Sequence, residues 1–596
     1  MAAKINNSDI ARLFRQVAAI YTIQNVNRFR IIAYEKAADA IETSNLEVRD
    51  LWQDKRLSEI PGIGATLSGH LDQLFTNGKV REYEELFKTV PAGMLTLLEV
   101  SGFGPKKAYR LASEFKLTDA ERTVDKLLKA AKEDKVAPIE GFGAKSQADI
   151  IEALERFKQG QNKKKRMPLP IADSSARQLV AYLQKLDEAV EVEPLGSLRR
   201  KVSTIGDVDI AVATGKAKSV LDYFLKYPKK EKTIEIGPGG ASLILDNNQQ
   251  ADLRVQKPQS FGAMLQYFTG SKQHNIHLRE FALKKGLSLS EHGIKLLKNK
   301  KQKIMEFSRE EDFYNYLGLP WIPPELREDL GEIEAAEKNK LPDLVKLSDI
   351  KGEVHVHTDY NLEPSHDLGQ NSLAEMVRKA QSLNYEYLGI SDHNPSISKH
   401  TENDIISIMK RRKFNYEQIM SKIKSVRVKL FIMLEVDILP NGKLALPERA
   451  FEFVDSLIVS VHSSFQMPKD EMTIRVLSAL SHQKVKILAH PSGRLIGRRE
   501  GYDLDWQKIF KFAKEKNKAI EINAHPARLD LVDVLVKRAV DNGNKLIIDT
   551  DSHDRESMDL MEYGISVARR GWAEKKDILN TLPYNRFKEW LFDQPS

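Results

Sequence analysis

Beyond residue 350, short apolar runs of strand length alternate with helix-compatible segments. The pattern repeats seven times, and each run ends in polar residues: EVHVH (353–357), YLGISDH (387–393), FIMLEVD (431–437), LIVSVHSS (457–464), VKILAHP (485–491), AIEINAHP (519–526) and LIIDTDSH (546–553). Strands that alternate with helices favour a parallel α/β barrel, in which the carboxyl ends of the strands meet on one face. We therefore expect the polar strand ends to form one site.

Histidines follow the same pattern. Ten of the fourteen histidines lie in 351–596, most of them at these strand ends. His355 and His357 are two residues apart and face one side of a strand, as do Asp551 and His553. A lone histidine beside apolar residues is ordinarily a core residue with a satisfied hydrogen bond, but seven strand ends carrying His or Glu favour a metal cluster. Imidazole and carboxylate without thiolate suit Mn²⁺, Zn²⁺ or Fe²⁺.

A second candidate site lies in the middle of the chain, in GSLRRKVSTIGDVDI (196–210) and ADLRV (251–255). Asp207 and Asp209 are two apart, so on a strand they project to the same side. A third carboxylate, Asp252, on a neighbouring strand would complete a cage for two divalent ions. Such ions clamp the attacking and leaving oxygens of a phosphoryl transfer. Two acids at this spacing are more often a solvated strand face.

The residues before these acids favour the functional interpretation. Gly196 and Ser197 form a turn that offers a backbone N–H and a hydroxyl to a phosphate, and Arg199 and Arg200 add charge suited to a triphosphate. Together with Gly206 they make a phosphoryl-transfer site the better interpretation.

In residue type and spacing, this segment resembles the palm of a family X DNA polymerase, the family of polymerase beta, and YFTGSKQHN (267–275) resembles its dNTP-binding segment. The resemblance implies that Asp207, Asp209 and Asp252 are catalytic and hold Mg²⁺ or Mn²⁺, and that Asp252 acts on the primer 3′-hydroxyl. Tyr267 and Phe268 would crowd the sugar. The implied nucleotide-binding residues are Gly196, Ser197, Arg200, Gly206, Tyr267, Phe268, Gly270 and Asn275, and the implied DNA contacts include Arg254 and Arg279.

The first 160 residues contain an internal repeat: PGIG (61–64), SGFG (101–104) and EGFG (140–143), each followed by a polar, helix-compatible stretch. Glycine permits positive φ, and the following helix N-terminus aims free N–H groups at a phosphate. One such turn is more often a plain helix connection. Three at a near-constant spacing resemble helix-hairpin-helix motifs, which grip the DNA backbone without reading sequence. The glycines expected at DNA are Gly62, Gly64, Gly102, Gly104, Gly141 and Gly143.

The sequence departs from the family pattern in the helix after the first turn. In family members with 5′-deoxyribose-phosphate lyase activity, a lysine of this helix forms a Schiff base. Here ATLSGHLDQLF (65–75) contains no lysine. His70 stands at the place of the nucleophile and Thr66 at that of a second lysine. We expect DNA binding without efficient lyase activity.

The segment 351–596 resembles a PHP (polymerase and histidinol phosphatase) domain. The implied ligands of a cluster of two or three ions are His355, His357, Asp367, His393, Glu435, His462, His490, Asp551 and His553. The loop DYNLEPSHDLGQNS (359–372) is longer than is usual in the family. Asp367 is therefore the preferred carboxylate of this loop, and Glu363 remains the alternative. We expect Asp392, Asp437, Asn523 and His525 to support the ligands.

The order of motifs resembles that of bacterial family X polymerases with a C-terminal PHP domain. It implies a multidomain chain: an α-helical, 8-kDa-like helix-hairpin-helix domain (1–90), fingers with further hairpins (91–165), an α+β nucleotidyltransferase palm (166–257), a thumb (258–319), a linker (320–350) and a distorted TIM-like (β/α)7 PHP barrel (351–596). The basic run KKKR at 163–166 would adjoin DNA, although so short a run is more often a solvated connector.

Composition agrees with a chain of this kind. Its 596 residues suit about four domains of ~150 residues, and a net charge of +8 suits a polyanionic partner. The absence of cysteine excludes disulfides, thiolate zinc sites and cysteine nucleophiles. MAAKINNSDI lacks the apolar core of a secretory signal, and no run approaches the ~20 apolar residues of a membrane span. We expect a soluble, cytoplasmic monomer on nucleoid DNA, with no membrane partner.

The expected function is a repair polymerase that fills short gaps, with gapped or primer-template DNA and dNTPs as substrates. In the family, the PHP domain is a metal-dependent 3′–5′ exonuclease, and incision at apurinic sites is a further family activity. Two alternatives remain open: a PHP domain that is only a metal-stabilised scaffold, and a small-molecule phosphatase fused to a DNA-binding module. Hydrolysis of phosphate monoesters as against DNA diesters separates these.

Overall fold

The computed structural model describes residues 5, 7–43, 48–53, 55, 57, 60, 62–100, 102–158, 166–297, 304–364, 366–423 and 426–593. The chain divides into two compact units, residues 1–165 and 166–596. Residues 163–165 of the basic run lie outside the described residues, as do Pro61 and Ser101 at the start of two hairpin turns.

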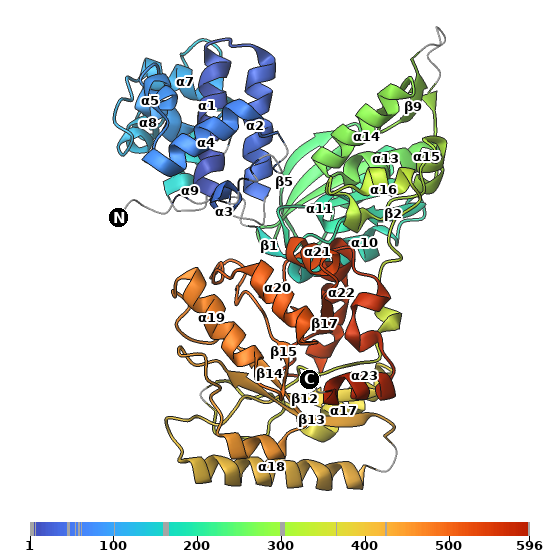
Figure 1. Ribbon diagram of the computed structural model, residues 1–596. Coiled ribbons are helices and arrows are strands. Elements are labelled where there is room, and N and C mark those ends of the chain that lie inside the picture. The colour runs from blue at the N-terminus through green and yellow to red at the C-terminus, as the bar shows by residue number, and fades with distance from the viewer. Residues whose placement is uncertain are drawn as a thin grey trace. The chain divides into compact units, whose positions relative to one another are not determined.

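The first unit is helical (Figure 1). Its helices are α1 (Asn7–Ile23), α2 (Arg28–Thr43), α3 (Val48–Gln53), α4 (Ala65–Asn77), α5 (Arg81–Phe87), α6 (Ala92–Leu97), α7 (Pro105–Glu114), α8 (Thr123–Lys132) and α9 (Ala144–Lys158). They pack around two apolar cores. Phe14, Tyr34 and Leu71 belong to one core, and Met94 and Leu127 to the other.

The second unit begins with a five-stranded sheet in the order β2-β4-β7-β6-β5, in which β4 and β7 are parallel and the other pairs antiparallel. The elements of this region are β1 (Met167–Pro168), α10 (Leu169–Leu183), β2 (Glu191–Pro194), α11 (Gly196–Arg199), β3 (Thr204–Ile205), β4 (Val208–Ala213), α12 (Ala217–Phe224), β5 (Lys230–Gly237), β6 (Gly240–Leu245) and β7 (Gln250–Gln256). Alternate residues of β4 face opposite sides. Ile210 packs in the core with Leu179 of α10, whereas Ala211 packs with Phe261 of α13.

A smaller region follows: η2 (Pro258–Ser260), α13 (Phe261–Thr269), α14 (Lys272–Lys284), β8 (Leu287–Ser290), β9 (Gly293–Leu296), β10 (Ile304–Met305), α15 (Glu310–Tyr316), η3 (Pro324–Leu326) and α16 (Glu332–Glu337). Ile322, Leu326 and Ile333 are buried in one core with Leu278 and Phe313. The segment expected to be a linker (320–350) thus contributes apolar side chains to the core formed by α14 and α15.

The remaining residues form the barrel. Its elements are η4 (Leu347–Asp349), β11 (Gly352–Glu353), α17 (Leu373–Ser382), β12 (Tyr387–Ile390), α18 (Glu402–Lys422), β13 (Lys429–Asp437), η5 (Glu448–Phe453), β14 (Ser456–Ser460), α19 (Lys469–Leu480), β15 (Val485–Leu488), α20 (Trp506–Glu515), β16 (Ala519–Asn523), α21 (Asp533–Asp541), β17 (Lys545–Asp549), η6 (Glu556–Leu560), α22 (Met561–Arg570), η7 (Lys575–Asp577), η8 (Leu579–Thr581) and α23 (Tyr584–Phe592).

In the described part of the chain, β11 to β17 form one sheet of seven parallel strands in sequence order. A bridge between Val356 and Ser552 joins the extensions of the first and last strands. The predicted strands and barrel class are therefore confirmed. Helices α17 to α22 pack outside the strands (Figure 1), and this two-sided burial explains the nearly continuous apolar runs.

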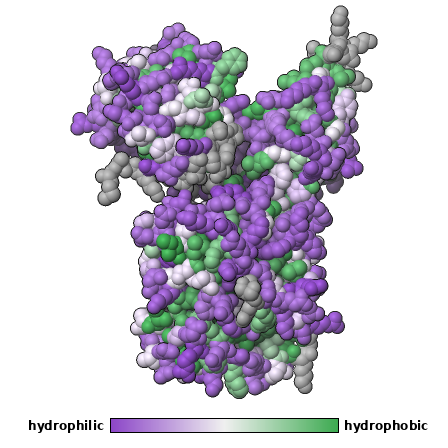
Figure 2. All heavy atoms as spheres, in the orientation of Figure 1, coloured by the Kyte–Doolittle hydropathy of each residue, from purple (hydrophilic) through white to green (hydrophobic). Residues whose placement is uncertain are grey.

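The visible face of the molecule is mostly hydrophilic, with scattered apolar residues (Figure 2). Among the described residues, no helix combines the length and apolar character needed to cross a membrane.

Candidate metal centre and nucleotidyltransferase site

Glu435, near the end of β13, lies at the centre of the histidine cluster. Its Oε2 is 3.0 Å from His393 Nδ1 and 3.2 Å from His355 Nε2, and its Oε1 is 3.0 Å from His490 Nε2. Two further ring nitrogens approach the same carboxylate, His462 Nε2 at 3.5 Å and His357 Nε2 at 3.6 Å. One buried carboxylate thus gathers histidines from four other strand ends.

Asp551, which follows β17, is the second carboxylate of the centre. Its Oδ1 is 3.2 Å from His357 Nε2, 3.5 Å from His355 Nε2 and 3.8 Å from His553 Nδ1. One donor atom each from His355, His357, Glu435 and Asp551 lie within 4.8 Å of one another. The barrel therefore brings together Glu435, Asp551 and all six histidines of the predicted ligand set.

The donor atoms fit a group of metal ions. Among the described residues, several buried atoms of the cluster have no hydrogen-bond partner, including His355 Nε2, both ring nitrogens of His357 and Glu435 Oε2. A buried polar atom without a partner is costly unless another ligand satisfies it. Imidazole and carboxylate donors in this arrangement suit Mn²⁺, Zn²⁺ or Fe²⁺.

Electrostatics favour the ligating forms of two of these side chains, Glu435 and His357. Burial alone would raise the pKa of Glu435, but His393, His355 and His462 lower it well below its usual range. Burial, together with His553 and His393 nearby, lowers the pKa of His357 to about 3. Glu435 is therefore a carboxylate and His357 a neutral imidazole, the forms that bind metal.

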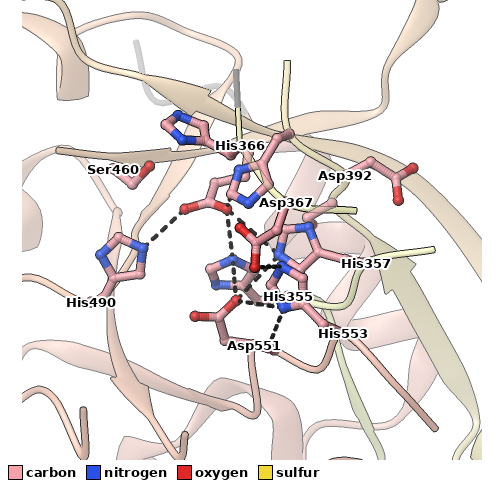
Figure 3. A network of polar contacts seen from close by, with 12 residues as sticks. His355, His357, His366, Asp367, Asp392, Ser460, His490, Asp551 and His553 are labelled. Atoms are coloured by element: carbon pink, nitrogen blue, oxygen red, sulfur yellow. Dashed lines mark hydrogen bonds and ion pairs between the residues drawn. The ribbon is translucent and has the colours of Figure 1, made fainter. Parts of the chain in front are cut away.

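The loop 359–372 contributes differently from the expectation. The mostly exposed Asp367 places Oδ2 3.7 Å from His553 Nε2, at the edge of the cluster. Its neighbour His366 points into the centre (Figure 3), with Nε2 3.0 Å from Asp437 Oδ2. Glu363 instead pairs with His400, at 3.0 Å. His366 was not among the predicted residues, and its only signal in the sequence is a histidine in the lengthened loop.

Other polar residues hold the ligands in place. Asp437 Oδ1 is 2.7 Å from His462 Nδ1, and Asn523 Nδ2 donates to Asp551 at 3.2 Å. Asp392 points away from the cluster (Figure 3) and pairs with Arg412, 2.7 Å away.

Glu521 was missed, although AIEINAHP places this buried acid two residues before Asn523 on one strand face. Its Oε1 lies 2.6 Å from His355 Nδ1. An acid inside an otherwise apolar strand was the available signal, because a buried carboxylate needs a partner.

The donors open into a cavity of about 370 Å³. Its lining includes His366, His525 and Arg528 beside the predicted ligands, and Arg528 Nε is 3.5 Å from Asp551 Oδ2. The site thus has room for a ligand and a cation at its wall.

Two of the three acids expected at the nucleotidyltransferase site lie on the parallel pair β4 and β7. Asp209 and Asp252 are direct neighbours in register. Gly196 closely approaches Asp209: its φ is +57°, and a Cβ there would be 2.7 Å from Asp209 Oδ2. Asp207 directly precedes β4 and is not part of the strand, so the expected i, i+2 strand pair is reduced to one strand residue and one turn residue.

The expected nucleotide and DNA residues meet beside this pair. Arg254, two residues after Asp252 on β7, stacks over the ring of Phe268 at 4.4 Å, and Arg279 lies over Tyr267 at 5.1 Å. Asn275 Nδ2 donates to the carbonyl of Tyr267 at 2.7 Å. The aromatic end of α13 therefore adjoins the strand that carries Asp252. Gly206 lies in the turn before β4, and Gly270 directly follows α13.

Two arginines follow the Gly196–Ser197 turn, and both are engaged. Arg199 pairs with Glu310 at 3.0 Å. Arg200 donates from Nε to Glu328 at 2.9 Å and from Nη1 to the carbonyl of Thr269 at 2.6 Å. These contacts orient the side chain expected to hold a triphosphate.

The three hairpin turns share one geometry. The first glycine of each has positive φ: +84° at Gly62, +82° at Gly102 and +86° at Gly141. The second glycine precedes α4, α7 or α9 directly: Gly64, Gly104 and Gly143. A Cβ at any of these last three would meet nothing within 4 Å. The turns therefore leave room for the phosphate backbone of a nucleic acid to approach closely.

Family models match four segments of the chain. They are a helix-hairpin-helix domain over 5–80, a SAM-like helix-hairpin-helix tandem over 94–156, the DNA polymerase beta thumb over 264–328 and a PHP domain over 353–525. The chain is 33% identical to "DNA polymerase/3′-5′ exonuclease PolX" of Bacillus subtilis (strain 168), over 97% of each chain. The chain belongs to the family X DNA polymerases with a C-terminal PHP domain.

More distant relatives match parts of this family X polymerase. DNA polymerase lambda of Arabidopsis thaliana is 24% identical over 54% of the chain and 62% of the relative. A "Probable phosphatase" of Caldicellulosiruptor saccharolyticus is 30% identical over 29% of the chain and 64% of the relative.

The helix of this family X polymerase that would carry a lyase lysine holds His70 in a closed polar network. His70 Nδ1 is 2.9 Å from the hydroxyl of Tyr83 and 3.1 Å from that of Tyr34, and Nε2 is 3.2 Å from Glu82. His70 is nearly buried. Both ring nitrogens of the side chain at the nucleophile's position are therefore engaged in hydrogen bonds within the protein.

Proposed function

We propose that this protein is a DNA-directed DNA polymerase that also degrades DNA from the 3′ end in its PHP domain. The observation that carries the proposal is the presence of two separate acidic centres in one chain. Asp209 and Asp252 adjoin a Gly-Ser turn in one, and Glu435 and Asp551 collect histidines in the other. The family to which the chain belongs supports both assignments.

For synthesis, Asp207, Asp209 and Asp252 would hold Mg²⁺ or Mn²⁺, and Asp252 would take part in activating the primer 3′-hydroxyl. Divalent ions at such a site stabilise the charge that develops on the transferred phosphoryl group. Gly196 and Ser197 would bind the triphosphate, and Phe268, held under Arg254, would limit the space at the sugar.

For degradation, the PHP ligands would hold Mn²⁺, Zn²⁺ or Fe²⁺, which supply an activated water and charge stabilisation. The role of the chain is to place the donors. Glu435 spans five histidines, and Glu521 and Asp437 fix the ring orientations of His355 and His462. Arg528, on the cavity wall, is placed to bind the scissile phosphodiester.

We infer that the substrate is gapped or primer-template DNA in repair. The open hairpin turns around Gly62, Gly102 and Gly141 suit sequence-independent contacts to the DNA backbone. Purified protein incubated with gapped DNA and each metal, with and without dNTPs, tests the proposal. We expect extension with dNTPs and 3′ shortening without them. Inactivity in every combination would refute it.

A second candidate for the PHP domain alone is a phosphatase of small molecules, favoured by the relative named a probable phosphatase. The same preparation assayed on a phosphate monoester and on a DNA diester separates the two. Faster turnover of the monoester would favour the phosphatase.

A further inference from the structure

Helix α22 of the barrel ends in Arg570, which contacts the arginine expected to bind the triphosphate. Arg570 Nη1 donates to Glu328 Oε1 at 2.8 Å and to the main-chain carbonyl of Arg200 at 2.8 Å. The same oxygen of Glu328 accepts from Arg200 Nε at 2.9 Å. One carboxylate oxygen therefore joins an arginine of the PHP domain to an arginine of the nucleotidyltransferase motif.

Arg570 is itself held firmly in the barrel. Its Nε is 2.7 Å and its Nη2 2.6 Å from Asp533 Oδ2, at the start of α21, and its side chain is nearly buried. Helix α22 packs against β16 and β17, the strands that lead to Asn523 and Asp551. Arg570 is thus held in place by the same strands and helices that support the metal centre.

The contact continues along the same helix. The Tyr563 hydroxyl donates a hydrogen bond to Asp173 at 3.1 Å, and Asp173 forms an ion pair with Lys201 at 2.9 Å. Lys201 directly follows Arg200, so α22 supports this part of the motif from two directions.

The charge of Glu328 affects how strongly Arg200 can attract a triphosphate. Burial alone would raise the pKa of Glu328, but Arg570 and Arg200 lower it to about 2, so Glu328 is an anion. Arg570 also pairs with Asp533, so the two arginines and the two carboxylates balance, and Glu328 divides its attraction between Arg570 and Arg200. Without Arg570, the carboxylate would be balanced by Arg200 alone, whose attraction for a triphosphate would fall.

We propose that Arg570 is a positioning residue for nucleotide binding: through Glu328 and the Arg200 main chain, the PHP domain orients Arg200 and preserves its charge for the triphosphate. This inference rests on the proposed polymerase function and on the expected role of Arg200. It makes the PHP domain a structural part of the nucleotide site, independently of any nuclease chemistry.

The test compares the full-length wild type with Arg570→Gln, Arg570→Lys and Glu328→Gln. The measurements are the KM for dNTP and kcat on gapped DNA. Arg570→Gln should raise the KM by about fivefold or more, in the range of ordinary coupling between sites, and should change kcat much less, because the acids are untouched. Arg570→Lys should restore part of the affinity.

Arg569→Gln is the matched control. Arg569 precedes Arg570 on α22, but its side chain pairs with Glu325 at 2.8 Å and donates to the main-chain carbonyl of Val345 at 3.2 Å. Its KM should stay at the wild-type value. Adding Arg570→Gln to Glu328→Gln should raise the KM by a smaller factor than adding it to the wild type, because one of the two contacts from Arg570 to Arg200 runs through Glu328.

The outcomes are distinguishable. A wild type without polymerase activity refutes the proposed function. An active wild type with an unchanged KM in Arg570→Gln, or an equal rise in Arg569→Gln, overturns the inference alone. Retained 3′–5′ degradation shows that the barrel of each variant is folded. If Arg570→Gln does not fold, the other two variants decide. A raised KM in Glu328→Gln supports the inference. KM values equal to that of the wild type in both Arg570→Lys and Glu328→Gln overturn it.

Discussion

Glu521 Oε1 lies 2.6 Å from His355 Nδ1, and both side chains are fully buried. A carboxylate that accepts from one nitrogen of a ligating imidazole fixes the ring and directs the other nitrogen toward the metal. The Nε2 atom of His355 accordingly faces Glu435 and Asp551.

Glu521→Gln should therefore weaken metal retention by roughly 10- to 100-fold. Metal content after dialysis and 3′–5′ degradation should fall together, while extension of a primer continues. Glu353→Gln is a matched control: Glu353 is equally buried, its pKa is raised by burial to about 8, and it accepts from Thr550. Full metal content in Glu521→Gln would contradict the positioning role.

Asp252→Ala should abolish nucleotide addition and leave DNA affinity largely intact, because we expect the helix-hairpin-helix turns to bind the DNA. Loss of one of three carboxylates removes a ligand of the ions that support phosphoryl transfer. Primer extension and a DNA-binding assay make the comparison, with the exposed Asp222→Ala as control. Full extension by Asp252→Ala would exclude this site.

Removal of one PHP ligand, as in His355→Ala, His462→Ala or Asp551→Ala, should eliminate 3′–5′ degradation and spare polymerisation. EDTA should stop both activities in the wild type. Mn²⁺ should restore degradation at least as well as Mg²⁺, since Mg²⁺ takes imidazole ligands poorly. A wild type that degrades no primer with Mn²⁺, Zn²⁺ or Mg²⁺, and variants that only melt at lower temperature, would instead favour a structural role for the cluster.

Borohydride should trap little covalent adduct on a 5′-deoxyribose-phosphate end, because His70 occupies the place of the nucleophilic lysine and is bound by Tyr83 and Tyr34. A lyase-competent family member serves as the positive control. An equal yield would mean that another lysine, such as the exposed Lys79, has taken over.

Glu310 should contribute pH-dependent stability. Burial alone would raise its pKa, but Arg327 and Arg199 lower it from 4.5 to about 2. Because the folded pKa is the lower one, the contribution of about 3 kcal/mol is complete above pH 4.5 and is lost as the pH falls from 4.5 through 2.

Melting curves of the wild type and Glu310→Gln test this contribution. The difference between them should be largest at pH 7 and should shrink below pH 4.5, where the wild-type carboxyl begins to take up a proton. The exposed neighbour Glu311→Gln should melt like the wild type at every pH. A difference that does not change with pH would contradict the ion-pair explanation.

The sequence by itself determined the barrel and the chemistry of its centre. Strands buried on both faces need continuous apolar runs, and their ends must become polar where they reach the site. Both features can therefore be recognised in a short stretch of the sequence. The sequence likewise predicted that Asp252 lies on a strand next to Asp209, because the residue types and spacing of the motif indicate a shared site.

Only the tertiary structure decided which side chains meet across long distances in the chain. The entry of His366 into the centre depends on the path of a lengthened loop, and the turn position of Asp207 depends on where β4 begins. Arg570 reaches Arg200 across 370 residues because α22 packs on the strands of the barrel. Periodicity and motif spacing report which face a residue occupies, whereas its partner is set by packing that no local pattern encodes.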